Sequence, residues 1–122
     1  MNKLVKLFIT SISAITLALV SFTSSFAKVD GEYIVLGSAI SLTGKYSSNG
    51  VHTQNGYNMA VERINKMGGV EVQGKKYKFE IIYYDDESNP KRAAQLAERL
   101  IKQDGVHYML GPYSSGLTKA IA

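Results

Sequence analysis

The sequence predicts an α/β fold with an open parallel sheet and three layers. From residue 28 onward, three apolar segments with strand character alternate with three helical segments, in the order strand, helix, strand, helix, strand, helix. The first apolar segment is nearly continuous, as in strands that are covered on both faces. Parallel strands joined by helices form an open sheet with helices on both sides, so these two observations together predict the fold class.

The first strand is expected at Tyr33–Ile40, where only Gly37 and Ser38 interrupt the apolar run. It leads into a loop, Ser41–Gly50, that is rich in hydroxyl groups and glycine, as irregular segments are. A helix is expected from about Thr53, because apolar side chains recur there at a spacing of three and four. These side chains are Tyr57, Ala60, Val61, Ile64 and Met67.

The second strand follows a glycine stop. Gly68 and Gly69 end the first helix, since glycine readily adopts the left-handed conformation that a helix C-terminus needs. Residues 70–76 are expected to form a short excursion with a turn around Gly74. Residues 77–84 are rich in aromatic and β-branched side chains and predict the second strand.

The second helix has a clear start. Asn89 is a favourable N-cap and Pro90 a favourable first helical residue. The expected apolar stripe consists of Ala93, Leu96, Ala97, Leu100 and Ile101. Gly105 marks the end of this helix, residues 106–110 predict the third strand, and a third helix is expected to begin near Ser115.

The first 27 residues are predicted to be a cleaved signal peptide. A short basic start precedes an apolar stretch from Leu7 to Val20, and small residues follow up to Ala27. We expect cleavage before Lys28. The alternative is a membrane anchor, but a span needs roughly 20 consecutive apolar residues, and this run is shorter and contains hydroxyl groups.

The chain contains no cysteine. A lipid anchor needs a cysteine directly after the cleavage site, and disulfides and thiolate metal sites need cysteine as well. We therefore expect an extracytoplasmic product without a lipid anchor, most simply in a periplasm.

The charge of the chain argues against nucleic acid as a partner. The formal net charge is +4, and two of these charges belong to lysines of the signal region, which leaves +2 for residues 28–122. This is not a nucleic-acid footprint. The basic cluster within residues 75–78 is interpreted as a solvated strand end.

The last residues, 117–122, have helical composition and lack a glycine, asparagine or proline that would end a helix. We expect the sequence to be part of a longer protein.

The candidate binding residues lie in the loops that follow the strands. In an open parallel sheet, ligands bind beyond the carboxyl ends of the strands, where the strand order reverses. We name residues 41–50 loop one, residues 85–89 loop two and residues 111–116 loop three. Loops one and three are rich in hydroxyl groups and backbone amides, which suits recognition of a small polar ligand. The start of the third helix could present free amides to a carboxylate, or Ser114 or Ser115 could simply cap it.

No arrangement of nucleophile, base and orienting acid is visible in the sequence, so we expect that the chain is not an enzyme. Asp85, Asp86 and Glu87 are interpreted as structural, because acidic residues are favoured near a helix N-terminus. The alternative is a metal cluster, since hard cations favour such oxygen ligands. His52 and His107 have no nearby partner in sequence that would make a metal or catalytic site, and we interpret each as structural or solvated. We expect no metal and no cofactor, and the glycine spacing fits neither dinucleotide nor phosphate loops.

Several spaced motifs resemble the branched-chain amino acid binding proteins. The motifs are IVLG at 34–37, SLTG at 41–44, INKMGGV at 64–70, YDDESNP at 84–90 followed by Ala93-Ala94, and GPYSSG at 111–116. The resemblance implies the type I periplasmic binding fold, in which two α/β lobes close on a ligand, and residues 28–122 would be the incomplete first lobe. It also implies delivery of the ligand to the membrane permease of an ABC transporter.

The resemblance implies a pocket between loops one and three. Its residues would be Tyr46, Ser47, Ser48, Asn49, Tyr113, Ser114 and Ser115. Ser115 and its neighbours would hold the carboxylate of the ligand, and loop one would line the opposite side. Some members carry an aromatic side chain at the position of Asn49, and related receptors bind amides, aromatic acids or short-chain organic acids. The expected ligand is therefore an amino acid or a similar small carboxylate.

Two alternatives keep an α/β sheet but change the role. The chain would be the ligand-sensing domain of a receptor or regulator if a membrane-spanning or signalling domain followed it. It would be part of an exported enzyme if a catalytic constellation lay elsewhere in the protein.

Overall fold

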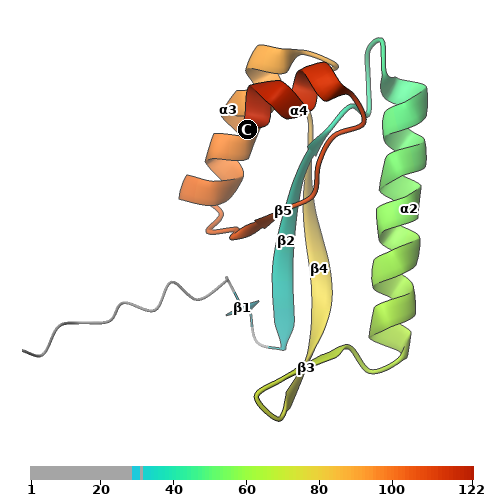
Figure 1. The fold of residues 1–122 in the computed structure, drawn as a ribbon, viewed down its shortest axis with the longest axis vertical. Helices are drawn as coiled ribbons and strands as arrows, with labels where there is room; N and C mark the ends of the chain where they lie inside the picture. Colours follow the sequence, from blue (N-terminus) through green and yellow to red (C-terminus); the bar gives the residue numbers. More distant parts are fainter. Residues whose placement is uncertain (1–28, 31) are drawn as a thin grey trace, which may run out of the picture.

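The computed structural model describes residues 29–30 and 32–122, which form a sheet with helices on both faces (Figure 1). Helix α2 (Ser47–Lys66) lies on one face, and helices α3 (Pro90–Lys102) and α4 (Ser115–Ile121) lie on the other. The open, three-layer α/β architecture predicted from the sequence is confirmed.

The predicted signal peptide, residues 1–27, lies outside the described residues. Within the described part, no helix is both long and apolar enough to cross a membrane.

The central strand is β2 (Tyr33–Ile40). It pairs in parallel with β4 (Lys75–Asp85) along its whole length, and with β5 (Tyr108–Met109) on its other edge. The chain therefore adds β4 on one side of β2 and then returns to add β5 on the other. Two short strands make antiparallel pairs, β1 (Val29–Asp30) with β2 and β3 (Val70–Val72) with β4.

Helix α2 begins earlier than the sequence predicts. The expected loop extends to Gly50, but the helix already starts at Ser47. Gly50 is buried, and a Cβ atom at this position would collide with the carbonyl oxygen of Ser41. The first turn of α2 thus packs directly on the backbone that follows β2, a contact that glycine permits and that residue preferences do not reveal.

The segment after α2 forms a hairpin. The predicted glycine pair ends the helix, with both residues at positive φ. Strands β3 and β4 are then joined by Gln73 and Gly74, whose φ values of 51° and 79° fit the type I′ turn of tight hairpins. As a result, the second strand begins at Lys75 rather than at the predicted Tyr77.

Helix α3 starts as predicted. The side chain of Asn89 accepts a hydrogen bond from the N–H of Arg92 at 3.1 Å, and Pro90 opens the helix. The buried members of the expected stripe are Ala93, Ala97 and Leu100. The prediction is wrong for Ile101, which is 53% exposed because it lies on the flank of the helix beside the buried stripe.

The third strand is shorter than predicted, since regular pairing covers only β5. The flanking residues still belong to the sheet region. The N–H of Leu110 donates to the carbonyl oxygen of Gly37 at 2.8 Å, and Val106 is buried. Helix α4 begins at Ser115, as predicted.

A hydrophobic core on the α3 face fixes the three parallel strands. Its buried members are Val35, Leu100 and Val106, against which Ile82, Tyr84 and Met109 pack. A Cβ atom at Gly37 would lie 2.9 Å from the side chain of Val106, so this glycine allows the close approach. Burial of such an aliphatic side chain stabilises a protein by about 1.5–3 kcal/mol, and the core thereby positions the loops at the strand ends.

Candidate functional site

The candidate site lies where the three parallel strands end. Loops one, two and three leave the carboxyl ends of β2, β4 and β5, which parallel pairing brings to one edge of the sheet. The order of strand addition reverses at β2, and crossover helices diverge at such a point to opposite faces of the sheet. Loops one and three therefore flank the position where this fold class offers room for a ligand.

Loops one and three meet through side chains. The ring centroids of Tyr46 and Tyr113 lie 6.4 Å apart with an interplanar angle of 52°, which is a favourable aromatic arrangement. The hydroxyl of Tyr57 in α2 donates to the carbonyl oxygen of Gly111 at 2.9 Å. The ammonium group of Lys45 lies 5.2 Å from the centre of the Tyr46 ring. The structure thus brings together one sequence-predicted pocket residue from each loop.

The other predicted residues of loop one lie in the first turn of α2, directly after Tyr46. Ser48 is exposed, whereas Ser47 and Asn49 are half-buried. The carbonyl oxygen of Asn49 accepts a hydrogen bond from the hydroxyl of Thr53 at 2.9 Å. Among the described residues, the side chains of these three residues have no hydrogen-bond partner, so their polar groups are available to a ligand.

The predicted serines of loop three lie at the start of α4. Ser114 occupies the N-cap position, but its side chain makes no capping hydrogen bond. Its carbonyl oxygen instead accepts from the N–H and the hydroxyl of Thr118 at 2.9 and 3.0 Å. Ser115 is exposed. The capping interpretation therefore does not explain these serines, and within residues 32–122 both hydroxyl groups are without a partner.

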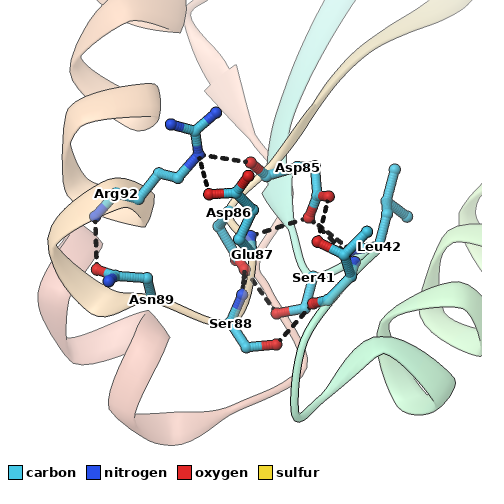
Figure 2. Close-up of polar contacts among 9 residues, drawn as sticks. Ser41, Leu42, Asp85, Asp86, Glu87, Ser88, Asn89 and Arg92 are labelled. Carbon is cyan, nitrogen blue, oxygen red and sulfur yellow. Dashed lines mark hydrogen bonds and ion pairs between the residues drawn. The ribbon is translucent and has the colours of Figure 1, made fainter.

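Asp85 of loop two binds loop one through its side chain (Figure 2). Its Oδ1 accepts hydrogen bonds from the N–H groups of Leu42 at 2.9 Å and Thr43 at 3.2 Å, and its Oδ2 accepts from the hydroxyl of Thr43 at 2.7 Å. The N–H of Glu87 donates to the same Oδ1 at 2.9 Å. One carboxylate thus joins the backbones of two loops.

Asp86 makes a second connection from a fully buried position. Its Oδ1 accepts from the hydroxyl of Ser41 at 2.6 Å and from the N–H of Ser88 at 2.7 Å. The hydroxyl of Ser88 donates to the carbonyl oxygen of Thr43 at 2.8 Å and accepts from the N–H of Tyr46 at 2.9 Å. The connected hydrogen bonds therefore reach Tyr46, the residue that touches loop three.

The electrostatic state of Asp85 follows from these contacts. Partial burial acts to raise the pKa of Asp85, but the hydrogen bonds from the Thr43 hydroxyl and from three backbone N–H groups outweigh it and hold the pKa below its ordinary value. Arg92 lies alongside, with its Nε 3.2 Å from the carbonyl oxygen of Asp85 and 3.1 Å from the carboxylate of Glu87. At neutral pH, loop one is thus held by an ionised carboxylate.

The structure gives these acidic residues specific contacts. Asp85 and Asp86 bind loop one and Glu87 pairs with Arg92, which supports their structural interpretation, and the first turn of α3 itself contains no acidic residue. A signal for the true role was present in the sequence. Asp85 and Asp86 lie at the end of one strand, the SLT segment at 41–43 follows a parallel one, and the ends of parallel strands meet. In the structure, the register pairs Ile40 with Asp85, so that the side chains at these two strand ends are close enough to form hydrogen bonds.

The two histidines make no contact with the residues of this site that the structure records, although His52 lies one helical turn after Ser48 in α2. His52 and His107 are both exposed. In the part of the chain that the structure describes, no group of three or more histidine, cysteine, aspartate or glutamate side chains is arranged to hold a metal ion. The site offers hydroxyl groups, amides and aromatic rings, which are groups suited to binding and orienting a small ligand.

Comparison with known proteins identifies a protein family that matches the chain. Residues 34–122 match the family described as periplasmic binding protein. The chain is 33% identical over 93 residues to the Leu/Ile/Val-binding protein BraC3 of Rhizobium johnstonii, a match that covers 76% of this chain and 24% of the relative. It is 34% identical over 113 residues to an amino acid binding protein of Pseudomonas aeruginosa, covering 93% of this chain and 28% of the relative.

A solved structure shows the same likeness. The branched-chain amino acid transporter substrate binding protein of Streptococcus pneumoniae, in complex with isoleucine, aligns with a TM-score of 0.64 and 31% identity. The alignment covers 71% of this chain and 24% of that protein. The chain thus spans about a quarter of the length of the relatives that it matches.

Proposed function

Because the chain belongs to the periplasmic binding protein family, we propose that it is the first part of the solute-binding component of an ABC uptake transporter. The proposed ligand is an amino acid or a similar small carboxylate, bound between two lobes, and residues 28–122 are the beginning of the first lobe. A Leu/Ile/Val-binding protein and an amino acid binding protein among its relatives support this ligand class.

The contact between loops one and three is the observation that carries the proposal. Tyr46 and Tyr113 meet at the point where the order of strand addition reverses, which is where open α/β sheets bind their ligands. An aromatic wall of this kind offers apolar contact area to the side chain of a small ligand. The site is therefore suited to holding a compact molecule that has one apolar and one polar end.

Ser114 and Ser115 supply the groups for the polar end of the ligand. Their hydroxyl groups have no partner among the described residues, and Ser114 leaves the first turn of α4 uncapped by its side chain. A carboxylate binds well to hydroxyl and amide donors, because hydrogen bonds to an ionised group are short and strong. We assign the carboxylate of the ligand to this side of the pocket and its remaining part to residues 46–49.

Asn49 supports a broader ligand class than branched-chain amino acids alone. Its amide offers both a donor and an acceptor, at a position where some members of the family have an aromatic ring. A ligand with a polar group on its side chain fits this pocket as well as an aliphatic one.

Export and delivery complete the proposal. The signal peptide would direct the protein to the periplasm and be cleaved before Lys28, and a membrane permease of the ABC class would receive the ligand. The role is binding and transfer rather than catalysis, in keeping with relatives whose names describe binding proteins.

The proposal is tested by isothermal titration of the complete natural product against a panel of amino acids and small organic acids. We expect at least one of them to bind with micromolar or tighter affinity. Ser115→Ala should then weaken binding by about 1–3 kcal/mol, because the ligand carboxylate loses a hydrogen-bond partner. Gln95→Ala, at an exposed position on α3, serves as the control with unchanged affinity.

Two results would count against the proposal. If the wild-type protein binds no member of the panel, the solute-binding role is wrong. If Ser115→Ala binds as tightly as the wild type, Ser115 does not hold the ligand.

A further inference from the structure

We propose that Asp85 and Asp86 are positioning residues that hold loop one in its ligand-binding shape, an inference that rests on the proposed function. Neither residue belongs to the pocket predicted from the sequence. Both act on the pocket through the backbone and side chains of residues 41–46, to which they are joined directly or through Ser88.

Loop one obtains most of its support from loop two. Between Ser41 and Tyr46, the polar groups bonded to loop two include three backbone N–H groups, one carbonyl oxygen and two hydroxyl groups. The two backbones also come close together. Gly44 has a φ of 81°, and a Cβ atom there would lie 2.6 Å from the carbonyl oxygen of Glu87. Loop one also has two internal backbone hydrogen bonds, from the N–H of Ser47 to Gly44 and from that of Gly50 to Tyr46, but loop two supplies more of its contacts between residues 41 and 46.

The carboxylate chemistry suits this task. An ionised aspartate offers about four acceptor positions on two oxygens and no donor, so one side chain satisfies several N–H and hydroxyl groups at once. Asp85 fills this capacity with four hydrogen bonds from residues 42, 43 and 87. The lowered pKa of Asp85 is consistent with this arrangement.

Asp86 is placed at some cost to stability. Its side chain is fully buried, yet its Oδ2 has no hydrogen-bond partner among the described residues. Unsatisfied buried polar groups lower the stability of a protein, and residues that break such a rule occur preferentially at functional sites. The other carboxylate oxygen, Oδ1, accepts hydrogen bonds from Ser41 and Ser88. Ser88 in turn accepts one from the N–H of Tyr46.

The benefit of this arrangement is preorganisation. A ligand that must first order a loop binds more weakly, because part of the interaction energy is spent on the lost conformational freedom. Binding residues that are held by a supporting shell avoid this loss. The hydrogen bonds that connect loop two to loop one extend as far as Tyr46. The ring of Tyr46 lies against that of Tyr113 in loop three.

Thr43 provides the most selective test, because its hydroxyl binds Asp85 while its side chain is outside the proposed pocket. Thr43→Val removes this hydroxyl at constant shape, and Thr43→Ser keeps it. In the complete natural product, we expect Thr43→Val to weaken ligand binding by roughly tenfold and Thr43→Ser to restore it to within about twofold of the wild type.

Asn65→Ala is the matched control at the opposite end of the sheet. The side chain of Asn65 donates to the carbonyl oxygen of Phe79 and accepts from its N–H, both at 2.8 Å. Removal of this bridge should destabilise the protein at least as much as Thr43→Val, as measured by thermal unfolding, but leave ligand affinity unchanged. If Asn65→Ala weakens binding as much as Thr43→Val, affinity follows overall stability and the positioning role is wrong.

Hydrogen exchange separates this inference from the proposed function. In the protein without ligand, Asp85→Ala should raise exchange at the amides of residues 42, 43 and 46, while β2 stays protected. If the wild type binds no ligand of the panel, the proposed function fails and exchange alone decides whether loop two holds loop one. Equal exchange in the wild type and in Asp85→Ala would overturn the inference, whatever the binding result.

Discussion

The two ends of the sheet are held together in different ways. At the amino end of β4, the hairpin with β3 and the side chain of Asn65 bind the strand edge through short local connections. At the carboxyl end, Asp85 and Asp86 reach across to loop one, which lies more than 40 residues earlier in the sequence. The difference shows that the binding loops are shaped by side chains that act over a long sequence separation, whereas the opposite end is shaped by its own turn.

The largest expected effect on stability comes from a matched pair of glycine substitutions, one at each end of the sheet. A Cβ atom at Gly50 would collide with the carbonyl oxygen of Ser41, and one at Gly69 with that of Tyr77. We expect Gly50→Ala and Gly69→Ala each to lower the free energy of unfolding by about 1–3 kcal/mol or more, because backbone must move to relieve the clash. Denaturant unfolding of the complete protein measures both.

Ligand titration then separates the two glycine variants. Only Gly50→Ala should also lose affinity, since it pushes the first turn of α2, which contains Ser47, Ser48 and Asn49, away from the backbone of Ser41. Equal affinity losses in both variants would mean that the two ends of the sheet are not independent.

Asp86→Ala is expected to have the next largest effect. The substitution leaves the hydroxyl of Ser41 and the N–H of Ser88 without their partner, so unfolding free energy should fall by about 1–3 kcal/mol. Asp86→Asn is the control, because its amide oxygen can still accept both bonds and its loss should be smaller. A variant Asp86→Ala as stable as the wild type would show that this connection does not hold the loop.

The acid sensitivity of the carboxyl end is a third expectation. The folded-state pKa of Asp85 lies below its ordinary value of 3.8, so its stabilising contribution is complete above that value and is lost as the pH falls through the folded-state pKa. The stability difference between the wild type and Asp85→Asn should therefore shrink on acidification. Thermal unfolding at a series of pH values tests this, and a difference that stays constant with pH would contradict it.

Local signals in the sequence were sufficient to predict most of the fold. The apolar run of β2, the glycine pair after α2 and the cap formed by Asn89 each depend on neighbouring residues, and each is confirmed. The start of α2 is different, because residues 47–50 have loop composition and become helical where Gly50 packs on Ser41. Tertiary contact overrides residue preference at that point.

The candidate site was only partly predictable for the same reason. The pocket between loops one and three was implied by the resemblance and stays a prediction, and the contact between Tyr46 and Tyr113 shows that the two loops meet. The role of Asp85 and Asp86 depends on the register of β2 against β4. A shift of the strand register by one residue would turn these side chains to the opposite face of the sheet. Composition does not determine the register, so it predicted only a general structural role for them.

A change in the middle of α2 should have the smallest effect, because it is distant from both ends. A Cβ atom at Gly56 would meet no other atom within 4 Å. Gly56→Ala should therefore stabilise the protein by about 0.4–1 kcal/mol, through the lower conformational entropy of the unfolded chain. Thermal unfolding measures the gain, with titration as the control for unchanged affinity, and a loss of affinity would show that α2 couples the two ends.

A crystal structure of the complete natural product with the ligand found by titration is the most direct test of the central claim. We expect the carboxylate of the ligand within hydrogen-bond distance of Ser114 or Ser115 and its remaining atoms against Tyr46 and Tyr113, with Asp85 still bound to Thr43. A ligand bound away from loops one and three would contradict the account.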